Sequence, residues 1–130
     1  MLKQVYKRFP NNDRCIEFLE GVIWVDGPKC PYCGSLNYTL AKESKRYHCN
    51  TCNTSFSVTV NTIFHKTKID LQKWFFAILL VYDYTSRISA RNLGEVLEIT
   101  KDSAWLMQKK IRKSIKENEV LFKKIIDKLK

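Results

Sequence analysis

The chain has 130 residues, a net charge of +10 at neutral pH and a hydrophobic content of 45%. Its length fits one domain or two very small ones, and its apolar content excludes wholesale disorder. The longest apolar run, Trp74 to Tyr82, has nine residues, whereas a membrane-spanning helix needs about 20, so we expect no membrane segment. Residues 1–10 lack the apolar run of a secretion signal, which favours a cytoplasmic protein.

The positive charge is unevenly distributed along the chain. Residues 1–27 have a net charge of zero, residues 28–70 of +4 and residues 71–130 of +6. Such an excess is typical of a protein that binds a polyanion, and it favours nucleic acid as the partner. A solvated lysine surface has the same composition, and charge alone does not separate DNA from RNA.

The first predicted helix runs from Asn12 to Ile23, with Asn11 or Asn12 as its cap. Cys15 lies on its apolar stripe, so we interpret this cysteine as a core thiol and not as a metal ligand. Asp26-Gly27-Pro28 ends the segment. Residues 1–28 are therefore predicted to be an N-terminal helix and a lead-in.

Two matched cysteine pairs follow, Cys30 with Cys33 and Cys49 with Cys52, separated by fifteen residues. This spacing is typical of a zinc ribbon, in which four thiolates surround one ion as a closed tetrahedron. It predicts one structural Zn²⁺; two disulfides, or redox chemistry at one pair, are the alternatives. Gly34 and Asn53 follow the pairs, and both residue types tolerate the positive φ that such a turn needs.

Short strands surround the cysteines. We predict strands at Asn37–Ala41 and Lys45–Cys49, joined by a polar turn at residues 42–44, and a third at Ser55–Val60 with its alternating apolar residues on one face. So small a unit depends on its metal for much of its folding free energy. Residues 29–69 are predicted to form this zinc ribbon and a connector.

A strongly apolar helix is predicted from Leu71 to about Tyr84, with Asp70 as a cap. Its core-facing residues follow the 3, 4, 7 spacing of an amphipathic helix. They are Leu71, Trp74, Phe75, Ile78, Leu79 and Tyr82.

Two further helices follow in close order. Ser89 caps a helix over Ala90 to Leu97, Glu98-Ile99 forms a tight turn, and Thr100 caps a helix from Lys101 to about Glu117. The inner stripe of the longer helix is Ala104, Met107, Ile111 and Ile115. Residues 70–117 thus predict a helix-turn-helix bundle, although any three-helix bundle can imitate this pattern.

The opposite face of the longer helix is basic. In a helix-turn-helix the start of the second helix meets base edges, and flanking cations meet phosphates. The candidate base-proximal residues are Lys101, Asp102, Ser103, Trp105, Leu106 and Lys109; the candidate phosphate contacts are Arg112, Lys113 and Lys116, with Lys45 and Arg46 from the ribbon. The alternatives are a solvated basic face, and a Trp105 that wedges into the bundle.

Residues 118–130 predict a basic amphipathic helix. Its apolar residues are Val120, Leu121, Ile125, Ile126 and Leu129. We expect this face to pair with a second copy, giving a homodimer, or with a catalytic partner subunit.

Several stretches resemble the N-terminal region of bacterial insertion-sequence transposases. They are Phe9-Pro10, Trp24-x-Asp26-Gly27-Pro28-x-Cys30-Pro31-x-Cys33-Gly34, Arg46-Tyr47-His48-Cys49, Phe56-Ser57-Val58-Thr59, Thr62-Ile63-Phe64-His65-Lys66-Thr67-Lys68, Trp74-Phe75, Ser103-Ala104-Trp105 and Ile111-Arg112. The resemblance implies a module that binds terminal-repeat DNA, with a ribbon followed by a helix-turn-helix. The family's RNase-H-like catalytic domain would begin near Lys130, so we expect no strand-exchange active site and no enzyme. Glu98 also stands where the family's turn often has glycine.

These observations together predict an α+β protein, a small antiparallel zinc ribbon followed by a helix-turn-helix bundle. We expect a zinc-dependent, nucleoid-associated protein that binds double-stranded DNA. The alternatives are a protein-interaction adaptor, the DNA-binding subunit of a split transposase, or an RNA-binding protein.

Overall fold

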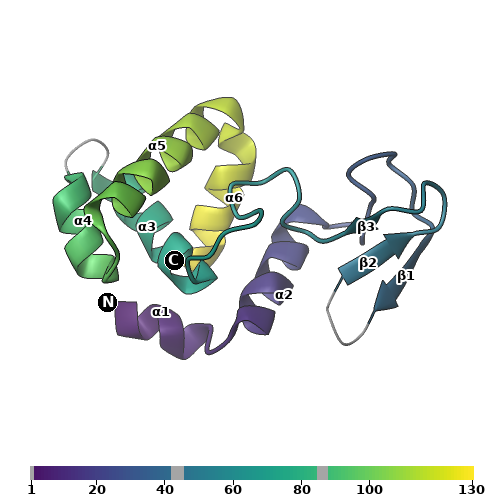
Figure 1. Cartoon of the computed structure of the whole chain (residues 1–130), viewed down its shortest axis with the longest axis horizontal. Helices are drawn as coiled ribbons and strands as arrows, with labels where there is room; N and C mark the ends of the chain where they lie inside the picture. The colour runs from purple at the N-terminus through teal and green to yellow at the C-terminus, as the bar shows by residue number, and fades with distance from the viewer. Residues whose placement is uncertain (1, 42–45, 85–87) are drawn as a thin grey trace.

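The computed structural model describes residues 2–41, 46–84 and 88–130. Within them the chain forms helices and one small antiparallel sheet, which confirms the predicted α+β class. The elements are α1 Leu2–Arg8, α2 Asn12–Ile23, β1 Tyr38–Ala41, β2 Arg46–Cys49, β3 Ser55–Phe56, α3 Leu71–Tyr84, α4 Ala90–Leu97, α5 Lys101–Glu117 and α6 Glu119–Leu129. The helices gather at one end of the molecule and the strands at the other (Figure 1). None of the described helices has the length and apolar character to cross a membrane.

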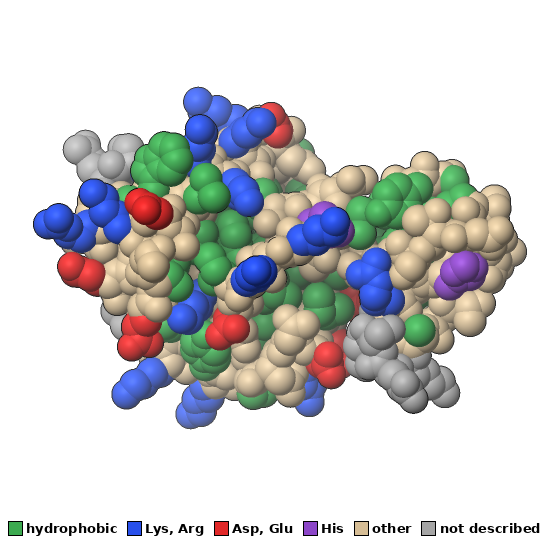
Figure 2. Space-filling model, in the orientation of Figure 1, with side chains coloured by type: hydrophobic (Ala, Val, Ile, Leu, Met, Phe, Trp, Pro, Cys, Tyr) green, Lys and Arg blue, Asp and Glu red, His purple; other side chains and the backbone are tan. Residues whose placement is uncertain are grey.

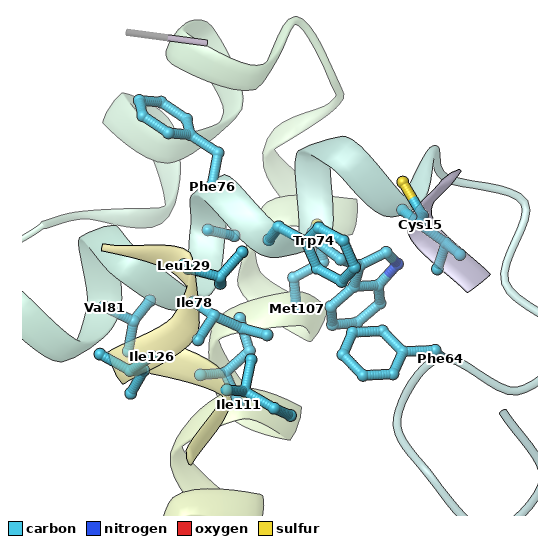
Figure 3. Packing of buried hydrophobic residues seen from close by; sticks show 14 of the residues in the cluster. Cys15, Phe64, Trp74, Phe76, Ile78, Val81, Met107, Ile111, Ile126 and Leu129 are labelled. Carbon is cyan, nitrogen blue, oxygen red and sulfur yellow. The ribbon is translucent and has the colours of Figure 1, made fainter. Parts of the chain in front are cut away.

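The apolar helix α3 is the centre of the helical part. It packs against α1, α2, α4, α5 and α6. One hydrophobic cluster contains buried residues from α2, α3, α4, α5 and α6, and the half-buried apolar side chains of α1 pack against it. Figure 3 shows the ring of Phe64 against Trp74 within this cluster, with ring centroids 5.9 Å apart. The prediction that Tyr82 faces the core is wrong, since this residue is 39% exposed. At the end of α3 the buried residue is Val81 instead.

Side-chain caps define where three helices begin. The side chains of Asn11, Ser89 and Thr100 accept hydrogen bonds from backbone N–H groups at the starts of α2, α4 and α5. The observed bounds of these helices confirm the prediction. Asp70 precedes α3, and its carboxylate accepts a hydrogen bond of 2.7 Å from the Tyr6 hydroxyl.

Glu98 ends α4 in the left-handed conformation, with φ 59° and ψ 44°. Its N–H donates back to the carbonyls of α4, and the Ile99 N–H donates to the Gly94 carbonyl at 2.9 Å. This conformation costs a residue with a side chain about 1–2 kcal/mol. The turn between α4 and α5 is therefore tight and strained at a position where glycine would fit.

The first helix, α1, was not predicted, and it joins the two ends of the chain. The Arg8 guanidinium donates to the carbonyl oxygens of Lys128 and Leu129, at 2.6 and 2.7 Å. These carbonyls lack partners within α6, so Arg8 caps the C-terminal end of that helix.

The predicted intermolecular pairing of the apolar α6 face does not agree with the fold. Phe122, Ile125, Ile126 and Leu129 are buried in the chain's own core, where α6 packs against α2, α3 and α5. The sequence shows that α6 is amphipathic but not which surface covers it. Among the apolar residues named for this face, only Val120 is exposed to solvent, at 69%.

The sheet has the order β1-β2-β3, and Tyr47 of β2 pairs with Leu40 of β1 and Phe56 of β3. The predicted third strand is too long: β3 ends at Phe56, and the chain then turns. Phe56 and Val60 enter the ribbon's own cluster, whereas Val58 packs in the helical cluster, so these residues do not share one face. The predicted turn at residues 42–44 lies outside the described residues.

Tyr47 and Trp24 connect the ribbon to the helices. The Tyr47 hydroxyl donates to a Glu20 carboxylate oxygen of α2 at 2.7 Å. Trp24, which follows α2, makes edge contacts with the rings of Tyr47 and Phe56, with centroids 5.2 and 5.8 Å apart. Burial and this hydrogen bond raise the pKa of the Tyr47 hydroxyl.

Candidate functional site

The four paired cysteines converge at the end of the ribbon, with their sulfur atoms all within 4.8 Å of one another. The Sγ atoms of Cys30 and Cys52 are 3.7 Å apart, and those of Cys33 and Cys49 are 3.5 Å apart. A tetrahedron with Zn–S bonds of about 2.3 Å has sulfur–sulfur edges of about 3.8 Å, whereas a disulfide requires about 2.05 Å. The sulfur separations therefore fit a single zinc ion, and the cysteines are free rather than bonded in pairs.

Two backbone turns of the same design hold these sulfurs. In the first turn the Gly34 N–H donates to the Cys30 carbonyl at 2.9 Å, and in the second the Asn53 N–H donates to the Cys49 carbonyl at 2.8 Å. In each turn the first cysteine's N–H donates to the carbonyl five residues later, at 3.0 and 2.9 Å. Gly34 and Asn53 have φ values of 77° and 58°, which confirms the predicted positive φ.

Local hydrogen bonds favour the thiolate of one of these cysteines. The Cys52 N–H donates to Cys49 Sγ at 3.5 Å, and this bond, with further hydrogen bonds from the Thr51 backbone and the neighbouring thiols, lowers the pKa of Cys49 to about 6. The thiolate is the form that binds metal. The Ser35 and Thr51 hydroxyls, 2.7 Å apart, link the two turns from outside.

The four thiolates suit one structural zinc, which would clamp both turns together and leave no position open for a reacting water. Cys15, as predicted, is separate: it is fully buried among the helices, and burial raises its pKa to about 12. His48 is exposed and lies outside the sulfur cluster. The donor set is therefore all sulfur.

The second candidate site is the outer face of α5. Its buried stripe consists of Ala104, Met107, Gln108 and Ile111, of which the sequence predicted all but Gln108. The Gln108 amide donates to the Ile88 carbonyl at 2.9 Å, which satisfies this buried polar group. Ile115 is only half-buried.

Most of the predicted DNA-binding residues lie exposed on α5. The exposed ones are Lys101, Asp102, Trp105, Leu106, Lys109, Arg112, Lys113 and Lys116. Figure 2 shows Lys and Arg side chains gathered along the upper edge of the molecule, over α5. Ser103 differs, because it is half-buried and bonded to the Thr100 cap by its N–H and its hydroxyl.

Trp105 does not wedge into the bundle, since 54% of its surface is exposed. The Lys109 Nζ lies 5.1 Å from the centre of its ring, within cation–π range. Leu106 beside it is 47% exposed. The outer face of α5 thus combines a flat aromatic ring with cations.

Comparison with known proteins agrees with the metal site. Residues 10–55 match a family described as "Transposase zinc-ribbon domain". This part of the chain is thus similar to the zinc-ribbon domain of transposases.

A curated relative connects the same region to a mobile element. The protein described as "Uncharacterized protein in transposable element ISH50" from Halobacterium salinarum is 29% identical over 98 residues, which cover 72% of this chain and 32% of the relative. The chain thus spans about a third of the length of this relative. No solved structure matches the chain.

Within the ribbon, Arg46 is exposed on β2 and its guanidinium donates to the Ser55 hydroxyl at 2.9 Å. Lys45 lies outside the described residues. Neither residue is close in sequence to α5. Lys110 of α5, which was not among the predicted DNA contacts, faces the segment between the ribbon and α3 across a cleft.

Proposed function

We propose that the protein is a zinc-dependent module that binds double-stranded DNA, in the manner of the terminal-repeat recognition part of a transposase. Its transposase zinc ribbon would order one end of the molecule, and α5 would enter the major groove. Bound in this way, the start of α5 meets base edges and the lysines further along meet phosphates.

One observation carries the proposal: α5 buries one stripe completely and presents the opposite face to solvent with Lys109, Arg112, Lys113 and Lys116 on it. Its acidic residues lie near its two ends, Asp102 in the first turn and Glu117 at the last position. The Lys113–Glu117 pair, at 4.0 Å, is exposed and therefore weak, so a phosphate can replace the carboxylate.

The packing of α4 against α5 supports the same proposal. A side-chain Cβ at Gly94 would lie 3.0 Å from the Ile99 carbonyl oxygen, so glycine lets the start of α5 approach α4 closely. The two helices and their short turn then form one rigid unit, as a recognition helix requires.

Binding to a random-sequence duplex, followed by fluorescence anisotropy over a range of salt concentrations, tests the proposal. Counterion release lowers log K linearly with log salt, by about 0.9 for each phosphate contact. The double variant Lys109→Ala/Lys113→Ala should bind more weakly and lower the slope by about 1 to 2. A flat salt response of the unmodified protein would contradict the proposal.

The matched control is Lys3→Ala/Lys7→Ala. These lysines are also exposed and four residues apart on a helix, but α1 lies on the other side of α3 from α5 (Figure 1). The control removes the same charge, and its slope should stay unchanged. Equal losses in both double variants would indicate attraction by overall charge and not a site on α5.

A role as a protein-interaction adaptor is the second candidate, and exposed apolar residues of the ribbon favour it. Tyr32 and Leu36 flank the first cysteine turn with 55% and 68% of their surfaces exposed. An adaptor of this kind would still bind its partner protein after Lys109 and Lys113 are replaced by alanine. It would lose that partner after Tyr32 and Leu36 are replaced.

A further inference from the structure

The segment between β3 and α3, residues 57–70, is fixed to both parts of the molecule. Phe64 is 3% exposed, and its ring contacts Trp74 and Phe75 of α3 at centroid distances of 5.9 and 6.0 Å. The Trp74 Nε1–H donates to the Thr67 hydroxyl at 2.8 Å. This segment, which we call the connector, therefore holds its exposed side chains in definite places.

Two adjoining clefts lie on either side of the connector. The first is bounded by His65 of the connector and by Lys110 and Lys113 of α5. The second is bounded by Lys66 of the connector and Arg46 of β2. Phe64 lines both clefts, so the cations around them form one band from α5 to the ribbon.

This band is positive in net charge. The acidic residues that line the clefts are Glu117 in the first and Asp13 in the second, against two Lys or Arg side chains in each. Figure 2 shows Lys and Arg side chains beside a histidine in the middle of this face, between the helices and the ribbon. A concave positive surface of this kind suits a polyanion.

The backbone of Lys66 adds a second, independent observation. Its φ is 55°, in the left-handed region, where a residue with a side chain costs about 1 kcal/mol relative to glycine. Strain of this kind tends to be kept at functional positions. It occurs here at an exposed lysine that forms no ion pair with any other residue the structure describes.

We propose that the connector is a second DNA-backbone contact, where Lys66 and Lys110 each bind a phosphate, flanked by His65 and Arg46. This inference rests on the proposed function. Lys110 lies three residues before Lys113 and about 60° around α5 from it, on the side toward the connector. A duplex seated on α5 would thus continue across the clefts toward the transposase zinc ribbon, and its phosphates would neutralise the band.

The test is the salt dependence of duplex binding by Lys66→Gln/Lys110→Gln, which leaves a polar side chain one atom shorter at each position and removes two charges. The slope of log K against log salt should fall by about 1.8, the value for two phosphate contacts. The control is Lys3→Gln/Lys7→Gln on α1, whose slope should equal that of the unmodified protein. An unchanged slope for Lys66→Gln/Lys110→Gln overturns this inference and leaves the proposed function intact, whereas a flat salt response of the unmodified protein overturns both.

Lys66→Gly separates charge from folding. Glycine relieves the left-handed strain at this position, so the variant should melt no lower than the unmodified protein while its slope falls by about 0.9. Lys66→Arg, which retains the charge, should keep the full slope. A Lys66→Gly slope equal to that of Lys66→Arg would also overturn the inference.

Discussion

Replacing Glu98 by glycine should stabilise the protein, because Glu98 occupies the left-handed conformation with φ 59° and ψ 44°. Removing the side chain relieves about 1–2 kcal/mol of steric cost. Glycine also gives the unfolded chain more freedom, which takes back about 0.5–1 kcal/mol. The side chain is exposed and forms no ion pair with another described residue. We therefore expect a net gain of about 0.5–1 kcal/mol in the free energy of unfolding.

The matched control is Glu95→Gly, which also removes one exposed carboxylate from the end of α4 but at a position inside the helix. Glycine there costs about 1 kcal/mol because of its low helix propensity. The two variants should therefore differ by about 1.5–2 kcal/mol in urea denaturation followed by circular dichroism, with zinc kept saturating. If Glu98→Gly loses as much stability as Glu95→Gly, the turn is not strained and our account of it is wrong.

Three further predictions concern the metal, the packing of α4 on α5 and the link between ribbon and helices. Chelation should remove one zinc per chain, as measured by elemental analysis, and should abolish the near-ultraviolet circular dichroism signal of the ribbon. Most of the helical signal at far-ultraviolet wavelengths should remain, because the helices have a separate core. Complete loss of helix would contradict this separation. Gly94→Ala should lower the free energy of unfolding by about 1–3 kcal/mol through overpacking, whereas Gly21→Ala, with open space around it, should raise it by about 0.5–1 kcal/mol. The pKa of Tyr47 is raised in the folded state by burial and by its hydrogen bond to Glu20. The free energy of unfolding should therefore fall as pH rises above about 10, where tyrosines of the unfolded chain ionise. Tyr47→Phe should flatten that fall in urea titrations, and an unchanged fall would count against the contact.

Local chemistry made part of this fold predictable from the sequence. The two cysteine turns follow from spacing and from residues that accept positive φ, and Gly34 and Asn53 meet that need within the turns themselves. The caps Asn11, Ser89 and Thr100 act on N–H groups two or three residues away, so the starts of their helices were also predictable.

Long-range packing decided the features that the sequence did not reveal. Val58 continues an alternating pattern, yet it packs against the helices because the chain turns after Phe56. The apolar face of α6 has a partner within the chain, and only the folded arrangement identifies it. Lys110 can likewise be singled out as a candidate phosphate contact only from the fold, because the connector lies across a cleft from it. In the sequence of α5 it is one lysine among several.

The way in which the ribbon is attached makes the metal relevant to the basic surface. Trp24 packs against both hydrophobic clusters, and Tyr47 of the ribbon bonds to Glu20 of α2. Phe56, just before the connector, and Val60, near its start, belong to the ribbon's cluster, and Phe64 further along the connector is buried in the helical cluster. The connector is thus held at both ends, once by a core that the zinc site closes and once by a core that does not need it. Loss of zinc should therefore free the ribbon side of the band, Arg46 first, while Lys109 and Lys113 keep their places on α5, so that the metal would control the extent of the DNA contact more than its existence.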